Sequence, residues 1–256
     1  MEAILSSHFR FLIWSLTLKD LKAQYKSAGL GFLWTALQPL LSMVILTAVF
    51  SYFMRIPAKN YALLVLSGLV PWYFHSACLE NGVQCFVSNA PLIKKVYFPR
   101  IALPISIILA NLIHFGIAVV VFLVIAAVLG TYPTEHFVLI FPAIIAQTIF
   151  SLGLMLLTGM SHVYYRDTKY IVSTILQAWF YLSPVLYPID MIPANMQTIA
   201  KLNPVYPVIH FCRCALSGHT WPSANAWIAL VGWAAIAACL GYFAYRRRAK
   251  FIADLV

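Results

Sequence analysis

Residues 101–130 read IALPISIILANLIHFGIAVVVFLVIAAVLG, a run that contains no Asp, Glu, Lys or Arg. A transmembrane helix needs about 20 consecutive apolar residues to cross the hydrocarbon core of a bilayer, and this run is longer. An apolar stretch of this length is typical of a membrane-spanning helix rather than of a helix in a water-soluble core. We therefore expect residues 101–130 to cross a membrane.

Similar apolar runs lie on both sides of this stretch, and each is long enough to cross a bilayer as a helix. They occupy residues 32–54, 61–88, 137–161, 170–188 and 224–245. Hydrophobic residues make up 62% of the 256-residue chain and charged residues 9%, which is more apolar surface than one water-soluble core could bury. The sequence therefore predicts an all-α, polytopic membrane protein with six transmembrane helices in a single transmembrane domain, residues 1–256.

The Lys and Arg residues, which give the chain a formal charge of +10, gather at alternate ends of the apolar runs. If the amino terminus faces the cytoplasm, the outer side carries only Arg55, Lys59, Lys201 and Arg213. The positive-inside rule then places both termini in the cytoplasm. Because these cations lie where lipid headgroups would meet them, we expect membrane lipids, and no nucleic acid, as partners.

The first 30 residues have a pattern of their own, which predicts an amphipathic helix lying in the inner interface of the membrane. Apolar residues recur at helical spacing at Leu5, Phe9, Leu12 and Leu16. A basic stripe follows at Lys19, Lys22 and Lys26. The helix leads directly into the first apolar run, so it could also contact a partner.

Residues 190–222 are too apolar for a free loop and too broken for a plain span. The breaks are at Pro193, Pro204, Pro207 and Pro222. Irregular backbone is tolerated at membrane depth only where other parts of the protein surround it. We therefore expect short re-entrant or interfacial helices on the outer side, before the last span at residues 224–245.

No residues of the chain form a recognisable catalytic, cofactor or metal site. The phosphate-binding pattern G-x-x-x-x-G-K-[ST] is absent, so if the protein uses ATP, another chain binds it. The five cysteines have neither zinc-ligand nor disulfide-framework spacing, and we interpret them as packing residues. A membrane-embedded enzyme is disfavoured, because no acidic pair or metal cluster is predicted at an aqueous edge.

Glu80 is the only acidic residue within a predicted span, and acidic groups inside membranes are usually functional. Glu80 could share a proton with His75, and His114 lies near the middle of the third run, so an ion-coupled secondary transporter is one hypothesis. The alternative is that Glu80 lies near the inner end of its helix and faces a wet cavity or a partner helix.

Two aromatic triplets lie away from the membrane interface, where most other aromatic residues of the chain are expected. They are Trp72, Tyr73, Phe74 and Trp179, Phe180, Tyr181, and we expect both toward the middle of their spans. Such rings can stack on the apolar faces of sugars, although ordinary packing explains them equally well. Since consecutive helical residues point to different sides, at most one or two of each triplet can line a path.

Five short motifs, in order along nearly the whole chain, resemble the permease subunits of ABC exporters for cell-surface polysaccharides such as O-antigen, capsule and teichoic acid. The first is Tyr25 with Leu30-Gly31, Trp34 and Pro39, and the second is Ser67-Gly68 with Pro71-Trp72. The third is the inner loop at residues 91–100, and the fourth is Tyr165-Arg166-Asp167. The fifth runs from Ser183-Pro184 through Asn203-Pro204 to Tyr206-Pro207. A departure is Gln24, where relatives often carry an arginine.

The resemblance implies a location in the cytoplasmic (inner) membrane and a homodimer of this chain with two nucleotide-binding ATPase subunits. Those subunits would bind ATP and Mg, and the substrate would be a lipid-linked glycan. Residues implied in coupling to the ATPase are Pro91, Lys94, Lys95, Tyr97, Arg100, Arg166 and Asp167. Residues implied in the translocation path are Trp72, Tyr73, Phe74, Glu80, Trp179, Phe180 and Tyr181. A permease of the same architecture for drugs or another lipid is the alternative within this class.

Overall fold

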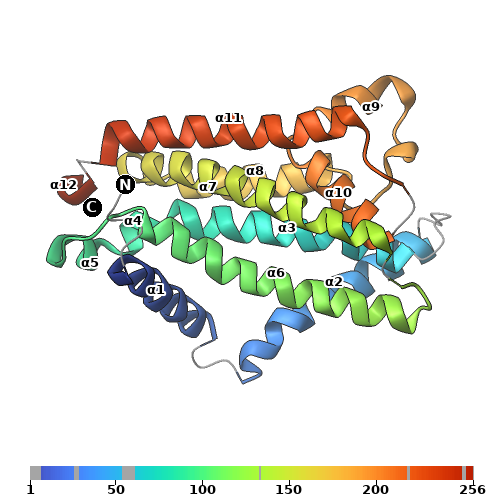
Figure 1. Ribbon diagram of the computed structural model, residues 1–256, viewed down its shortest axis with the longest axis horizontal. Coiled ribbons are helices and arrows are strands. Elements are labelled where there is room, and N and C mark those ends of the chain that lie inside the picture. Colours follow the sequence, from blue (N-terminus) through green and yellow to red (C-terminus); the bar gives the residue numbers. More distant parts are fainter. Residues whose placement is uncertain are drawn as a thin grey trace.

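The computed structural model describes residues 7–25, 29–53, 61–132, 134–217, 220–249 and 252–255. All regular secondary structure in these ranges is helical, as the sequence predicts, and the long helices run along the longest axis of the molecule (Figure 1). Four are apolar and long enough to cross a membrane: α3 (Tyr61–Val83), α6 (Ala102–Val128), α7 (Ile140–Tyr164, preceded by η4, Glu135–Leu139) and α11 (Ala224–Arg248). These helices give the chain the architecture of a multi-pass membrane protein.

Helix α3 is the centre of the bundle. It packs against α2 (Trp34–Thr47), α6, α7, α8 (Thr168–Leu182) and α10 (Tyr206–Ser217). In its most apolar stretch 72% of the residues are buried inside the protein, whereas the corresponding share for α11 is 22%. Side chains of α3 therefore face other helices, while α11 presents most of its apolar surface to its surroundings.

The remaining two predicted spans form shorter helices. Helix α2 continues into a π-helical stretch, η3 (Ala48–Phe53). Helix α8 has 15 residues, about 22 Å at the rise of an α-helix, which is less than the hydrocarbon thickness. It ends at Leu182 and not at residue 188, because Ser183 precedes a proline and adopts an extended conformation with ψ 143°. Crossing of the membrane by α2 and α8, and hence a total of six spans, stays a prediction.

The short helices lie at the two ends of the bundle (Figure 1). Helices α4 (Cys85–Ser88), α5 (Ala90–Lys95) and α12 (Ile252–Leu255) lie at one end, and α9 (Ala194–Lys201) and α10 lie at the other. The basic ends of α5 and α11 therefore share one end of the bundle. This is the grouping that the distribution of Lys and Arg predicts, although the side of the membrane that it faces stays a prediction.

Helix α1 (Ser7–Tyr25) forms within the predicted interface segment and has two apolar faces. Phe9 and Leu16 are buried, and the helix packs against α6 through this face. Phe11, Trp14 and Leu18 are exposed on the opposite face. A helix with a free apolar face and nearby lysines suits the interfacial position predicted for it. Leu5 and Lys26 of the predicted pattern lie outside the described residues.

Helices α7 and α11 touch through their backbones. A Cβ atom added to Gly153 would lie 2.2 Å from the carbonyl oxygen of Ala237, and one added to Gly241 would lie 2.2 Å from that of Gly153. Small residues let transmembrane helices approach this closely, and the resulting van der Waals contact is a main source of their association. Glycine at these positions therefore fixes the distance between the two helices.

The segment predicted to be re-entrant contains three short helices: η5 (Ile189–Met191), α9 and α10. Before them, the turns at residues 183–187 lie against α3, where a Cβ on Gly68 would be 2.6 Å from the Val185 carbonyl oxygen. Arg213 donates hydrogen bonds to the carbonyls of Val185 (2.9 Å) and Tyr187 (3.2 Å), and Tyr61 donates to that of Leu186 (2.6 Å). Side chains thus satisfy backbone groups that no helix pairs, which non-helical chain at membrane depth requires. Entry of this segment into the membrane stays a prediction.

Candidate functional site

A cleft of about 690 Å³ opens between α2, α3, α6 and α8, beside the last turn of α1. Its walls combine aromatic rings with hydroxyl and amide groups. The polar side chains include Gln24, Thr35, Gln38, Ser76, Asn81 and Gln177. A mixed aromatic and amide lining offers both stacking surfaces and hydrogen-bond partners, which is the chemistry that sugars require.

The cleft brings together six of the seven residues implied in the translocation path: Trp72, Tyr73, Phe74, Glu80, Phe180 and Tyr181. Trp72 and Phe74 are only 4% and 3% exposed, so they back the wall and present little surface. Tyr181 is 63% exposed, and the partly buried Tyr73 donates a 2.7 Å hydrogen bond to the Ser42 hydroxyl. Their role in transport stays a prediction.

Trp179 lies outside the cleft lining and braces the wall from behind. Its ring meets those of Trp72, His75 and Phe150 edge-on, with centroid distances of 6.4, 5.3 and 6.4 Å. Its indole nitrogen donates a 2.8 Å hydrogen bond to Asn203 Oδ1. The expectation that this triplet lies mid-helix is wrong, because α8 stops at Leu182 and places Trp179 in its last turn.

His75 and Glu80 occupy different environments. His75 is fully buried between α3 and α7, with Nδ1 3.0 Å from the Ser151 hydroxyl. Glu80 is exposed and borders the cleft. Within the described ranges no hydrogen bond or ion pair joins the two. This arrangement favours the interpretation in which Glu80 faces a wet cavity over a shared proton.

A second polar contact, which sequence reasoning missed, crosses the α3–α7 interface one turn from His75. Gln147 Nε2 donates a 2.7 Å hydrogen bond to the carbonyl of Pro71. His75 Nε2 and Gln147 Oε1 are buried without a partner in the part of the chain that the structure describes. Gln147 follows no periodic or motif pattern, so the sequence contained no signal for its hydrogen bond to Pro71.

His114 connects three helices at the edge of the cleft. Its Nε2 lies 2.8 Å from Gln24 Oε1 on α1, and its Nδ1 lies 3.4 Å from the Thr35 hydroxyl on α2. Gln24 thus holds α6, the third predicted span, to α1, the predicted interface helix.

The residues implied in ATPase coupling lie mostly on the surface around α5. Lys94, Lys95 and Pro91 are exposed and Tyr97 is 100% exposed, whereas Ile93 is buried beneath them. A shallow groove of about 250 Å³ follows this corner. Lys94 and Lys95 have no ion-pair partner among the described residues. Their charges are therefore open to a partner of opposite sign.

The other three implied coupling residues are arranged differently. Arg100 is partly buried, and its guanidinium donates a hydrogen bond to the Ala249 carbonyl at the end of α11. Arg166 and Asp167 are exposed in the turn between α7 and α8. This turn lies at the same end of the bundle as α5 (Figure 1). Arg100 thus holds the corner in place, while Arg166 and Asp167 extend its polar surface.

Comparison with known proteins gives consistent matches. A family model described as ABC-2 type transporter matches residues 11–215. The O-antigen export system permease protein RfbA of Myxococcus xanthus is 33% identical over 224 residues, 87% of this chain and 86% of the relative. A protein of the same name from Klebsiella pneumoniae is 35% identical over 195 residues, 76% of this chain and 75% of the relative. The polysialic acid transport protein KpsM of Escherichia coli is 22% identical over 209 residues, 79% of this chain and 80% of the relative.

Proposed function

The chain belongs to the ABC-2 type transporter family, and on that premise we propose that it is the permease subunit of a polysaccharide exporter in the cytoplasmic membrane. It is a transporter subunit rather than an enzyme. The observation that carries the choice of substrate is the match to O-antigen export permeases over most of both chains. The similarity to the polysialic acid transport protein KpsM supports the same class of substrate.

Energy comes from a separate ATPase subunit, which binds ATP and Mg. The absence of a phosphate-binding loop from this sequence supports that division of labour. The corner around α5 is the proposed docking surface, because Lys94, Lys95 and Tyr97 are exposed there together. An acidic, partly apolar groove on the ATPase would complement it, since unpaired cations steer and orient partners of opposite charge. The ATPase is cytoplasmic, so the end of the bundle that carries α5 faces the cytoplasm, and both termini of the chain are cytoplasmic.

The path for the glycan lies between two copies of this chain. Support comes from α8, where Tyr170, Ser173, Gln177 and Tyr181 are all exposed at the spacing of one helical face. A polar stripe of this kind is costly against lipid tails. It becomes favourable when it faces a wet path or a second copy. Helix α11 shows the contrast, with Ile228, Val231 and Leu240 exposed as a lipid-facing surface would require.

The cleft also fits the amphipathic character of a lipid-linked glycan. Tyr73, Phe180 and Tyr181 offer ring surfaces, and the neighbouring amides and hydroxyls offer donors and acceptors. The exposed apolar residues of α8, such as Ile175 and Leu182, would border the lipid portion. The proposed substrate is therefore a polysaccharide carried on a lipid.

The test uses the permease reconstituted in proteoliposomes with and without its ATPase. We expect the permease alone to hydrolyse no ATP, and the complex to move an O-antigen-type lipid-linked glycan in an ATP-dependent way. Tyr181→Ala should slow transport, while Ile228→Ala, which changes a similarly exposed residue on the lipid-facing surface of α11, should not. ATP hydrolysis by the purified chain alone, or equal transport by the two variants, would contradict the proposal.

A further inference from the structure

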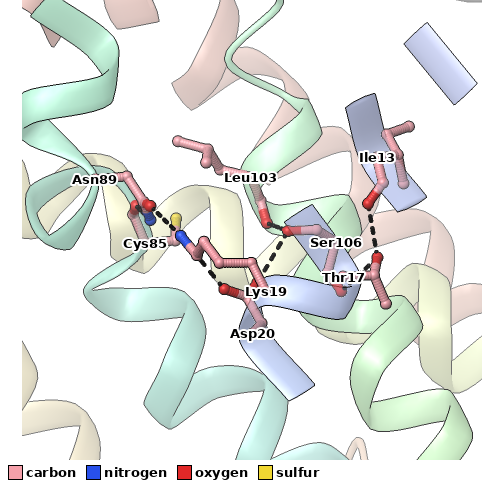
Figure 2. A network of polar contacts seen from close by, with 8 residues as sticks. All are labelled: Ile13, Thr17, Lys19, Asp20, Cys85, Asn89, Leu103 and Ser106. Atoms are coloured by element: carbon pink, nitrogen blue, oxygen red, sulfur yellow. Dashed lines mark hydrogen bonds and ion pairs between the residues drawn. The ribbon is translucent and has the colours of Figure 1, made fainter. Parts of the chain in front are cut away.

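Helix α1 is held to two other parts of the protein by a network of polar contacts (Figure 2). Lys19 Nζ donates a 2.8 Å hydrogen bond to Asn89 Oδ1, which lies 70 residues along the chain. The next residue, Asp20, accepts a 3.2 Å hydrogen bond from the Ser106 hydroxyl in the first turns of α6. Thr17 is buried against the same part of α6. The network thus joins α1 to both the α4–α5 junction and α6.

Asn89 lies at the junction of α4 and α5, in the proposed docking corner. It ends α4 and begins α5, and the backbone amides of Leu92 and Ile93 both donate to its carbonyl. Its side-chain amide donates a 2.8 Å hydrogen bond to the Cys85 carbonyl, while its side-chain oxygen accepts from Lys19. Both polar ends of the side chain are therefore engaged, and a rotation of α5 must displace the anchor of Lys19.

The carboxyl-terminal end of α1 lies at the cleft. Gln24 is five residues beyond Lys19, about 7.5 Å along the helix axis, and it borders the cleft. Its side-chain oxygen is bonded to His114 Nε2 at 2.8 Å, and His114 borders the cleft as well. One rigid helical segment thus has the docking corner at one end and the cleft wall at the other.

The Lys19 ammonium group contacts two partners in the structure, one on each side of the α1–α5 contact. The ammonium group lies 2.8 Å from Asn89 Oδ1 and 3.6 Å from Asp20 Oδ1, on its own helix. If α5 moves away, Asp20 keeps a partner for Lys19 while α1 is released from the corner. Coupling between distant sites requires an element that switches between two discrete arrangements. A Lys19 side chain that exchanges Asn89 for Asp20 would be such an element, whereas packed helices do not deform continuously.

We propose that α1 is a coupling arm: movement of the α4–α5 corner passes through the Lys19–Asn89 hydrogen bond to α1, and through Gln24–His114 to the wall of the cleft. This inference rests on the proposed function, since it assumes that an ATPase moves the corner. Lys19 and Gln24 act as positioning residues and need not touch the substrate.

The matched pair of variants is Lys19→Met and Lys22→Met. Both remove one exposed lysine from α1, but Lys22 has no hydrogen bond or ion pair in the described part of the chain. Lys19→Arg is the conservative variant, because arginine can still donate to Asn89. Thermal unfolding of each purified variant separates loss of coupling from loss of folding.

The readout is the accessibility of the cleft in the complex with its ATPase. A cysteine introduced by Ser173→Cys, in a Cys239→Ser background, reports it through its rate of maleimide labelling with and without trapped nucleotide. Ser173 borders the cleft, and the other four native cysteines are buried. ATP hydrolysis and glycan transport are measured on the same preparations.

We expect nucleotide to change labelling in the wild-type and Lys22→Met complexes. Lys19→Met should reduce both the change in labelling and the transport per ATP hydrolysed by at least about five-fold. The rate of ATP hydrolysis and the unfolding midpoint should stay at the wild-type values. Lys19→Arg should restore the change in labelling and the transport. The double variant Lys19→Met with Gln24→Leu should be no worse than either single one, because both break the same arm. Wild-type behaviour of Lys19→Met, or additive loss in the double variant, would overturn the arm while leaving the proposed function intact. Failure of the wild-type complex to transport would overturn the proposed function and the arm with it.

Discussion

Replacing Gly153 by alanine should force α7 and α11 apart. The added Cβ would lie 2.2 Å from the Ala237 carbonyl oxygen and 2.7 Å from the Ala238 nitrogen, both of them backbone atoms that cannot rotate away. The two backbones must therefore separate by roughly 1 Å, since packed interiors leave no slack for the methyl group. Overpacking of this kind costs about 1–3 kcal/mol.

The assay is thermal unfolding of the purified protein in detergent, followed by tryptophan fluorescence. At about 2–4 °C per kcal/mol for a chain of this size class, the midpoint of Gly153→Ala should fall by several degrees. Gly116→Ala is the matched control: it lies inside helix α6, and its new Cβ would meet nothing within 4 Å. That control should be neutral or stabilise by about 0.5–1 kcal/mol, because alanine favours the helix. Equal midpoints for the two variants would refute the close contact of α7 with α11.

Three further changes have expected outcomes. Asn203→Leu removes the hydrogen bonds to Trp179 and Ser183 and should destabilise the protein by about 2–4 kcal/mol, measured by thermal unfolding. Asn195→Leu, at an exposed position, is the control. Equal unfolding midpoints for the two variants would refute the role of Asn203 in holding Trp179 in place. The double variant Lys94→Glu, Lys95→Glu should abolish capture of the ATPase in a pull-down, while Lys201→Glu at the opposite end of the bundle should not. Equal capture by the two variants would show that the α5 corner is not the docking surface. Gly68→Ala should lower the unfolding midpoint, because its Cβ would lie 2.6 Å from the Val185 carbonyl oxygen, and an unchanged midpoint would contradict that contact.

The all-helical bundle could be predicted because apolar run length is a local property of the sequence. The runs at 101–130 and 224–245 correspond to α6 and α11 within a few residues. The run at 170–188 was extended too far because it continues to be apolar beyond Ser183-Pro184. Hydropathy does not show that the proline ends the helix while the apolar chain continues as turns at residues 183–187.

Contacts between distant segments could not be predicted in the same way. Lys19 was interpreted as a headgroup-facing cation, which its position on α1 allows, but its partner Asn89 is 70 residues away. His75 and Gln147 contribute to one interface only because α3 and α7 pack together. The aromatic triplets were identified from their position in the sequence, yet only packing separates Tyr181, at the cleft, from Trp179 behind the wall.

Transport by the purified complex is the most direct test of this account. Proteoliposomes containing this chain, its ATPase and a fluorescent lipid-linked polysaccharide are supplied with ATP, and the labelled glycan that crosses the bilayer is measured. We expect ATP-dependent transport that requires both subunits and ceases when Lys94→Glu and Lys95→Glu are combined. Transport that is independent of this chain, or that persists with the ATPase omitted, would contradict it.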